Sequence, residues 1–401
     1  MYTDFKSDLR APDFDGNDAN TRTSRWNWEV FILSKVMSLH DAVAKYVHDG
    51  DSISFGGFTT NRKPYAAVHE ILRQGQKDFI VYAGPAGGDW DMLIGEGRVK
   101  AYINCYTANS GYTNVSRRFR AAIEKNEVLF EDYSQDAIMF MLHASSLGLP
   151  FLPVRFMIGS GMVDEWGISK EVRQTIDKLP NDKYVYLDNP FTGEKTVALP
   201  VPKLDTAIIH VQMASPDGTC RILGDEFHDV DIAIAAKNVI VTCEELVTNE
   251  YIRRDPTQNK IFGECVNAVV HCPKGAHPSQ VYGYYDYDPA YFKEYDAASK
   301  YQDGPDAVAQ LKKAAAKAQK ALDKKPGDEK LAAALEKANQ AAADAESGAK
   351  VPETFRDFCE KYVYSVKSHE EYLDKLGATR LLKLLDTSGF GYAAQLDAIE
   401  R

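Results

Sequence analysis

The chain lacks the features that mark several broad function classes. Its 401 residues carry 47 basic and 58 acidic side chains, a net charge of −11, so no basic excess exists to neutralise a phosphate backbone. No apolar run approaches the length needed to span a bilayer. We therefore expect neither nucleic acid nor a membrane as a partner.

Paired cysteines and a secretory signal are also missing. The six cysteines form no C-x-x-C pair, and four lie in or beside apolar strand-like runs, where cysteine acts as a small hydrophobe. Metal ligation is the alternative for them. The first 28 residues are polar and lack the cationic start and apolar core of a signal peptide. These observations predict reduced, buried thiols in a cytoplasmic protein.

Short apolar runs alternate with helical patterns along most of the chain. Tyr65–Gln74 is a helical pattern that starts after Pro64 and stops at Gly75, as helix termini prefer. The strand-like runs are Ser52–Phe55, Phe79–Tyr82, Ala101–Cys105, Ala207–Met213, Val239–Cys243 and Ala268–Cys272. This alternation predicts an α/β fold with an open, mainly parallel sheet and helices on both faces. Such sheets bind ligands at the carboxyl ends of their strands.

Composition suggests how the chain is organised. Residues 1–35 are a polar N-terminal extension, and residues 36–302 form the α/β domain, with a subdomain boundary near the polar, proline-bearing stretch 180–203. Residues 303–350 are rich in Ala and Lys, lack aromatics and are interrupted by Pro-Gly, which predicts an inserted helical hairpin. Residues 351–401 complete the body with a helical C-terminal part. The two expected hairpin helices are Asp306–Asp323 and Asp328–Glu346.

Two glycine-rich turns follow strand-like runs. The first is Gly56-Gly57-Phe58-Thr59, which is followed by Arg62. Its paired glycines let the backbone approach an anion. The alternative is that a sharp turn requires glycine for steric reasons alone. The second turn, Gly84–Gly88, lacks dinucleotide spacing and a Walker lysine. Its N–H groups could instead serve as donors to a thioester carbonyl.

Other polar groups form no complete catalytic set. Asn109 and Ser110 follow a strand and suit a small polar acid, or are ordinary loop polarity. Three arginines in Ser116–Arg120 suit phosphates, a solvated helix face or a subunit contact. His277 is a lone histidine, which is more often structural than catalytic. Neither a nucleophile–base–acid set nor a metal cluster emerges.

Long blocks of the chain resemble one known family. They are SLHDAVAKYVHDGDSISFGGFTTNRKPYAAVHEILRQG, AGPAGGDWDMLIGEGRVKAYINCYTANSGYTNVSRRFR, GSGMVDEWGISKEVR, ASPDGT, VTCEE, IRRDPTQN and GAHPSQ. These blocks are similar to the A subunits of the glutaconate CoA-transferases, within the class I CoA-transferase family. The resemblance covers about residues 36–300 and 353–392 and leaves out the extension and the hairpin.

The resemblance implies an enzyme chain that works with an obligate B subunit in an (AB)n assembly. The pair would move CoA from acetyl-CoA or glutaconyl-CoA to a short dicarboxylate such as glutaconate or 2-hydroxyglutarate. A glutamate of the B subunit would attack the acyl-CoA and become a glutamyl-CoA thioester in a ping-pong reaction. CoA thioesters are then substrates, and no cofactor is bound permanently. The corresponding loop here, Tyr82–Pro85, holds no carboxylate, so the nucleophile is expected in the partner.

We expect the substrate to be bound by the strand-end loops and a few polar residues near them. Glu131 and Gln135 match an E-x-x-x-Q stretch of related A-type subunits, and a glutamate in this region is a proposed catalytic group in thioester hydrolase relatives. Two alternatives stay open: a CoA-thioester hydrolase or ring-opening subunit that uses Glu131, and a non-catalytic scaffold or binding protein. The expected substrate-binding residues are Gly56, Gly57, Phe58, Thr59, Arg62, Gly87, Gly88, Asn109, Ser110, Gln135 and His277.

Overall fold

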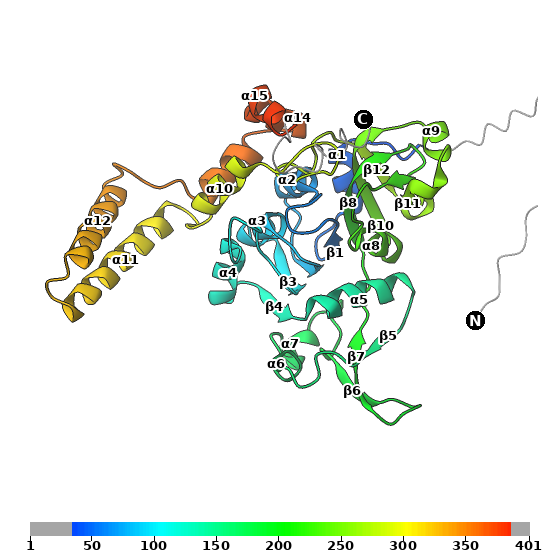
Figure 1. The fold of residues 1–401 in the computed structure, drawn as a ribbon, viewed down its shortest axis with the longest axis horizontal. Coiled ribbons are helices and arrows are strands. Elements are labelled where there is room, and N and C mark those ends of the chain that lie inside the picture. The colour runs from blue at the N-terminus through cyan, green and yellow to red at the C-terminus, as the bar shows by residue number, and fades with distance from the viewer. Residues whose placement is uncertain (1–33, 386–401) are drawn as a thin grey trace, which may run out of the picture. The chain divides into compact units, whose positions relative to one another are not determined.

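A nine-stranded, mainly parallel sheet forms the centre of the computed structural model, which describes residues 34–385 (Figure 1). Its parallel strands lie in the order β12–β10–β8–β1–β2–β3–β4, while β9 pairs antiparallel with the carboxyl end of β8 on one side and with β11 on the other. The expected α/β sheet is confirmed. The strands are β1 (Ser52–Phe55), β2 (Phe79–Tyr82), β3 (Val99–Asn104), β4 (Leu129–Asp132), β8 (Thr206–Ala214), β9 (Cys220–Arg221), β10 (Asn238–Leu246), β11 (Asn259–Ile261) and β12 (Ala268–His271).

Helices cover both faces of this sheet, because the strands are apolar on both sides. One face packs against α1 (Leu39–Tyr46), α2 (Tyr65–Gln74), α3 (Gly88–Gly95), α4 (Arg117–Glu124), α10 (Pro289–Ala298), α13 (Phe355–Cys359) and α14 (His369–Leu376). The other packs against α5 (Gln135–Ser146) and α8 (Asp229–Ala235). Shorter helices are α6 (Gly161–Asp164), α7 (Lys170–Arg173), α9 (Asn249–Arg253) and α15 (Ala378–Lys383).

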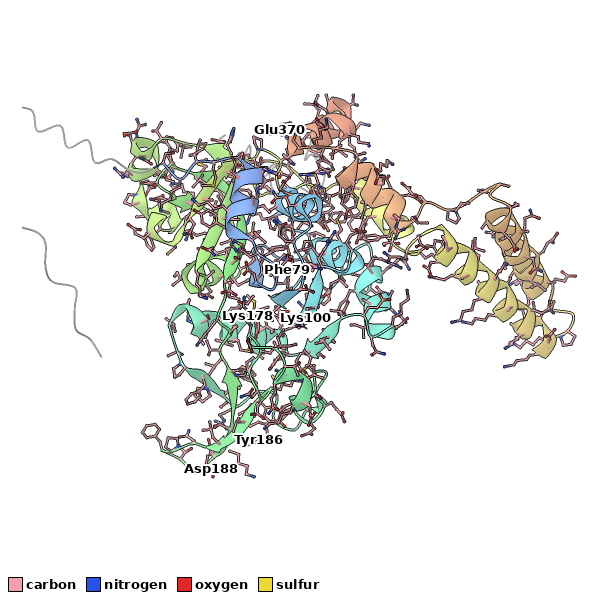
Figure 2. All side chains as sticks on the ribbon, turned by 180° about the vertical axis from the view of Figure 1, so that it is seen from behind. Phe79, Lys100, Lys178, Tyr186, Asp188 and Glu370 are labelled. Carbon is pink, nitrogen blue, oxygen red and sulfur yellow. The ribbon has the colours of Figure 1, made fainter. Side chains whose placement is uncertain are left out.

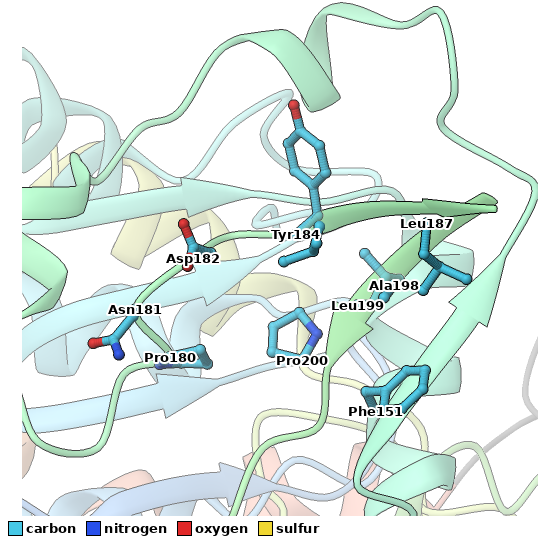
Figure 3. A pocket seen from close by; sticks show the side chains of 10 residues that line it. Phe151, Pro180, Asn181, Asp182, Tyr184, Leu187, Ala198, Leu199 and Pro200 are labelled. Carbon is cyan, nitrogen blue, oxygen red and sulfur yellow. The ribbon is translucent and has the colours of Figure 1, made fainter. Parts of the chain in front are cut away.

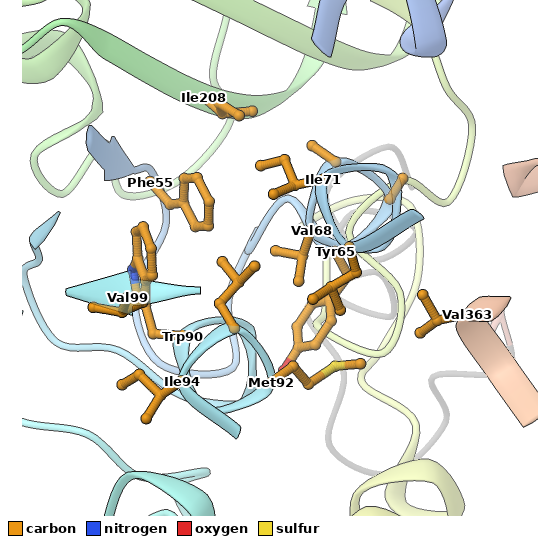
Figure 4. Close-up of a cluster of buried hydrophobic side chains, with 14 of the residues drawn as sticks. Phe55, Tyr65, Val68, Ile71, Trp90, Met92, Ile94, Val99, Ile208 and Val363 are labelled. Carbon is orange, nitrogen blue, oxygen red and sulfur yellow. The ribbon is translucent and has the colours of Figure 1, made fainter. Parts of the chain in front are cut away.

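The hydrophobic core on the first of these faces, which includes residues of α2 and α3, positions the helices that follow the loops at the strand ends. Phe55, the last residue of β1, stacks on Trp90 of α3 with ring centroids 4.0 Å apart, and both side chains are fully buried (Figure 4). Helix α2 ends as expected at Gly75, whose φ of 90° suits glycine and whose N–H bonds to the carbonyl of Ile71. Burial of aromatic side chains of this size contributes roughly 2–3 kcal/mol each.

A small antiparallel sheet packs against the hydrophobic core on the other face, the one that α5 and α8 cover. It consists of β5 (Phe151–Val154), β7 (Lys195–Pro200) and β6 (Val185–Asp188). The stretch 180–203, expected as a polar subdomain boundary, therefore contains two strands. Val197 and Leu199 are fully buried, whereas Tyr186 and Asp188 of β6 are exposed (Figure 2). The polar residues of this stretch, such as Asn189 and Glu194, lie mainly in the turn between the two strands, which explains the polar composition.

The Ala- and Lys-rich segment forms the expected helical hairpin. Its helices are α11 (Gly304–Lys324) and α12 (Glu329–Glu346), joined through an ion pair of 2.7 Å between Lys312 and Glu346. The chain segments on either side of the hairpin run together. The N–H of Phe355 donates to the carbonyl of Tyr301 at 2.9 Å, and the N–H of Arg356 donates to that of Gln302 at 3.1 Å.

The chain changes direction across the sheet at β1. Strand β1 pairs with β2 on one side, where β3 and β4 follow, and with β8 on the other, where β10 and β12 follow. The loops after β1 and β2 therefore diverge from those after β8. In open α/β sheets a crevice forms at such a switch point, so the carboxyl end of β1 is where a ligand site is expected.

Candidate functional site at the carboxyl ends of the strands

The turn after β1 requires glycine at two consecutive positions. Gly57 has a φ of +75°, and a Cβ there would lie 2.3 Å from the carbonyl oxygen of Asn61. A Cβ at Gly56 would lie 2.6 Å from Oδ1 of Asp229. Both distances are far below contact distance, so the steric explanation of this glycine pair has direct structural support.

Two consecutive residues at the start of α8 hold this turn from both sides. Nε2 of His228 donates to the carbonyl of Phe55 at 3.0 Å, and Oδ1 of Asp229 accepts the N–H of Gly57 at 2.7 Å. Burial lowers the pKa of His228 to about 4, so the ring is neutral at pH 7. Its Nδ1 is buried without a hydrogen-bond partner. His228 and Asp229 thus fix the conformation of the turn.

Arg62 does not present a free guanidinium group to a substrate. Its Nη1 donates to Oδ2 of Asp229 at 2.5 Å and to the carbonyl of His210 at 3.0 Å, and Nη2 donates to the carbonyl of Asp225 at 2.7 Å. The side chain is only 3% exposed. We expected Arg62 to donate hydrogen bonds directly to the acid substrate. In the structure its guanidinium group donates to acceptors of the protein instead.

The turn after β2 is tied to its neighbours in the same way. The N–H of Gly87 donates to Oδ1 of Asp89 at 2.9 Å, and the N–H of Gly88 donates to Oδ1 of Asn109 at 2.7 Å. The N–H of Thr59 donates to the carbonyl of Pro85 at 3.0 Å, which joins the first turn to the second. These amides already have acceptors, so they do not form the set of free thioester donors that the sequence suggested.

A buried ion pair lies beneath these turns. Nζ of Lys63 lies 3.3 Å from Oδ2 of Asp89, with both side chains at most 1% exposed. Because Asp89 also accepts the N–H of Gly87, Lys63 supports the second turn through this carboxylate. Opposite charges at such a distance stabilise each other strongly once water is excluded.

A hollow of about 480 Å³ opens beside the first turn. Phe58 and Phe227 form one wall, with stacked rings whose centroids are 5.0 Å apart. Among the lining residues Arg62 is the only cation and Asp225 the only carboxylate, and Asp225 is exposed. The full lining consists of Phe58, Asn61, Arg62, Leu223, Gly224, Asp225, Phe227, Gln280 and Tyr282.

Sequence reasoning missed most of this hollow. Only Phe58 and Arg62 of its lining were expected at the site, and Gln280 is the last residue of the GAHPSQ block. His228 and Asp229 lie in the stretch Asp225–Asp231, where an acidic run around a histidine was the available signal. No local pattern connects that run to the distant turn after β1.

Ser110 and Gln135 are exposed and open to a ligand. Ser110 follows Asn109 in the loop after β3, and Gln135 is the first residue of α5, directly after β4. Both lie on the carboxyl side of the sheet. Their role in substrate binding stays a prediction.

Glu131 is part of a buried ionic cluster. Its carboxylate bonds to Nη2 of Arg173, lies 2.9 Å from Nζ of Lys183, and accepts the N–H groups of Gly167 and Ile168 at 3.0 and 3.2 Å. The side chain is fully buried. Such a carboxylate has no free lone pair for a substrate proton. This geometry gives Glu131 a structural role, joining β4 to the segment around α7.

His277 is likewise engaged by protein groups. Nδ1 lies 2.7 Å from the hydroxyl of Tyr372, and Nε2 lies 3.0 Å from Oδ2 of Asp288, which Arg380 also contacts. Burial lowers the pKa of His277. The expected contact of His277 with substrate is not seen, because both ring nitrogens bond to residues of α14 and the start of α10.

Another hollow lies on the small sheet, away from the glycine turns. It has a volume of about 370 Å³ and an apolar lining from Phe151, Leu187, Ala198 and Leu199, together with the loop that begins at Pro180 (Figure 3). It contains none of the residues expected at the site. Among residues 34–385, no group of three or more His, Cys, Asp or Glu side chains is arranged to hold a metal ion. Within the same range, no helix is long and apolar enough to cross a membrane.

The fold and the site together define a mainly parallel α/β protein with a hollow beside the turn that follows β1. The family model described as Coenzyme A transferase matches residues 36–271. The chain belongs to this family, which confirms the expectation of a CoA-transferase chain.

Individual relatives agree with this assignment. The chain is 57% identical over 361 residues to the A-type chain of the glutaconate CoA-transferase of Acidaminococcus fermentans, covering 90% of this chain and 97% of the relative. The crystal structure of glutaconate coenzyme A-transferase from that organism matches with a TM-score of 0.73, covering 88% of this chain and 95% of the other. The "Cholesterol ring-cleaving hydrolase IpdA subunit" of Rhodococcus jostii is 30% identical over 66% of this chain and 87% of its own length.

Proposed function

We propose that the chain is the A-type subunit of a two-subunit CoA-transferase. The pair moves CoA from acetyl-CoA or glutaconyl-CoA to a short dicarboxylate such as glutaconate or 2-hydroxyglutarate. The observation that carries the proposal is the 57% identity to the A-type chain of a glutaconate CoA-transferase over 90% of the chain. The turn after β2 adds support, because Ala83, Gly84 and Pro85 offer no carboxylate.

The reaction proceeds through a glutamate of the B subunit. Its carboxylate attacks the acyl-CoA carbonyl, the C–S bond breaks, and CoA leaves as thiolate, so that a mixed anhydride of the acyl group and the glutamate remains. The thiolate then attacks the glutamyl carbonyl, releases the first acid and forms a glutamyl-CoA thioester. The acceptor acid reverses both steps. In this scheme the present chain supplies preorganised turns that wall the acid site, and the assembly is a heteromer of the (AB)n type.

Coexpression with a B-type chain tests the proposal. We expect CoA transfer from acetyl-CoA to glutaconate by the copurified complex and no transfer by either chain alone. Mass spectrometry of the complex after incubation with acyl-CoA alone should find CoA attached to a glutamate of the B-type chain. Transfer by this chain alone, or CoA attached to this chain, would contradict the proposal.

A hydrolase that uses Glu131 is the second candidate function. The 30% identity to a ring-cleaving hydrolase subunit favours it, but at much lower similarity than the transferase relative. The enclosed position of Glu131 between Arg173 and Lys183 argues against it. Glutaconyl-CoA hydrolysis that exceeds transfer, and that is lost on Glu131→Gln without loss of folding, would favour the hydrolase.

A further inference from the structure

The buried pair of Arg62 and Asp229 controls the charge of the hollow beside the first glycine turn. Arg62 is the only cation in the lining, and its Nη1 lies 2.5 Å from Oδ2 of Asp229. The two side chains are 3% and 0% exposed. Since water is excluded from the pair, neither charge is screened by solvent, and each is cancelled mainly by the other.

We propose that Asp229 is a specificity-determining residue that neutralises Arg62, so that the hollow has no free positive charge and receives an uncharged part of the acid or acyl group. The inference rests on the proposed transferase function and adds which chemical part of the substrate enters. An uncompensated Arg62 would attract a carboxylate bidentately. With Asp229 in place, that attraction is already satisfied inside the protein.

The remaining lining agrees with an uncharged occupant. Phe58 and Phe227 offer a stacked aromatic wall, and Asn61 and Gln280 offer amides that bond to neutral polar groups. The only other charge is the exposed carboxylate of Asp225, which repels anions. The charged end of a dicarboxylate is therefore bound outside this hollow, on the exposed side of the site or by the partner subunit.

Asp229 is held in place by more than its ion pair. Its Oδ1 accepts the N–H of Gly57, while Oδ2 accepts from Arg62, so one carboxylate both shapes the turn and neutralises the cation. A purely structural pair predicts that its loss lowers activity towards all acids equally. A pair that sets specificity predicts that the preference among acids changes, and that the direction depends on which charge is removed.

The test uses three variants of the coexpressed complex: Asp229→Asn, Arg62→Gln and the double variant. For each, kcat/KM is measured with glutarate and with butyrate as acceptors, which differ in one carboxylate. The quantity compared is the ratio of the value for glutarate to the value for butyrate. Asp229→Asn leaves Arg62 unpaired, so the ratio should rise at least about tenfold, which equals about 1.4 kcal/mol. Arg62→Gln leaves Asp229 unpaired, so the ratio should fall by a similar factor.

The double variant restores neutrality and should return the ratio to within about threefold of the unmodified complex, whatever its absolute rate. If Asp229→Asn does not fold, the comparison of Arg62→Gln with the double variant still decides, because adding Asp229→Asn must then raise the ratio. Equal ratios in all folded variants would overturn the inference.

Asp225→Asn is the matched control on the same rim. Its carboxylate is exposed, so removing it should raise the ratio only slightly, and the change should vanish at high salt. A rise as large as that of Asp229→Asn would overturn the role of the buried pair. Absence of any CoA transfer by the unmodified complex would instead refute the proposed function, before the variants are compared.

Discussion

The side chain of Asn109 accepts the backbone N–H of Gly88 through its Oδ1 at 2.7 Å and thereby connects the loop after β3 to the start of α3. Asn109 is 1% exposed, and a Cβ at Gly88 would lie 2.5 Å from the hydroxyl of Tyr65. The backbone of Gly88 is therefore enclosed, and its N–H has an acceptor only because Asn109 stands there. The geometry of the second turn depends on a side chain from the next strand.

Replacing Asn109 by Ala should lower both stability and transfer activity. The N–H of Gly88 would be left buried without an acceptor, at a cost of roughly 1–3 kcal/mol. Asn109→Asp retains an acceptor oxygen and should keep more of the stability than Asn109→Ala. Urea unfolding and kcat/KM of the three proteins measure both effects. Equal stability of Asn109→Ala and the unmodified protein would show that the contact does not hold the turn.

Gly57→Ala should abolish the local conformation of the first turn. The added Cβ would lie 2.3 Å from the carbonyl of Asn61, a contact that only a backbone shift relieves. Gly50→Ala is a matched control, because Gly50 has a φ of +76° but nothing within 4 Å of an added Cβ. We expect about 1–2 kcal/mol loss for the control and a larger loss for Gly57→Ala. Thermal unfolding and transfer assays of both variants check this, and equal effects would contradict it.

Glu131→Gln should destabilise the protein by about 3–5 kcal/mol, because Arg173 and Lys183 would lose their buried carboxylate. The exposed pair of Arg120 and Glu124 supplies the comparison, since Arg120→Gln should cost at most about 0.5 kcal/mol. Denaturant unfolding of both variants measures the difference. A fully stable Glu131→Gln protein would remove the structural role assigned to this residue.

Asp91 should make stability depend on pH between about 4 and 6. Burial raises the pKa of Asp91 from 3.8 to about 6, although its carboxylate accepts from the N–H of Phe119 and the hydroxyl of Tyr295. The folded protein then binds a proton more readily than the unfolded chain. Stability from this group is therefore present at low pH and falls by up to roughly 3 kcal/mol as pH rises through 6.

Asp91→Asn should remove this slope while keeping an acceptor for Phe119. Because Asn cannot ionise, the free energy of unfolding of the variant, relative to that of the unmodified protein, should increase from pH 4.5 to pH 7. Urea unfolding at the two pH values measures the change, and a difference that stays constant with pH would contradict the raised pKa of Asp91.

Deleting the hairpin should leave the fold intact. Tyr301 and Gln302 already bond to Phe355 and Arg356, so a short Gly/Ser linker can replace residues 305–350 without moving the chain on either side. We expect an unchanged circular dichroism spectrum per body residue and retained CoA transfer. Loss of transfer with an intact fold would show that the hairpin serves the assembly.

The regular elements were predictable because their signals are local. Strand β1 and helix α2 have the expected bounds, since a buried apolar run and the Pro64 and Gly75 boundaries lie within the segments themselves. The small sheet was missed, because buried Val197 and Leu199 belong to a short apolar run that lies between polar turn residues and prolines. Local propensity also could not show that stretch 180–203 packs against α5.

The site shows the same division between local and distant information. The glycine turns were found from the residues next to them, but their supports were not. Asp229, which bonds to Gly57, is 172 residues away in sequence. Arg62 was expected to bind the acid, but Asp229 pairs with its guanidinium group. Pairing between distant residues therefore decides whether a charged side chain in a loop is free to bind a ligand.

The internal hydrogen bonding of the two turns has a consequence for how the two chains associate. The amides of Gly56, Gly57, Phe58, Thr59, Ala86, Gly87 and Gly88 all donate to acceptors within this chain. Hydrogen exchange at these amides should therefore be slow before any partner arrives, and little conformational entropy remains to be lost on docking. For the proposed complex we therefore expect association of the two chains to be limited by diffusion and orientation rather than by folding of these turns.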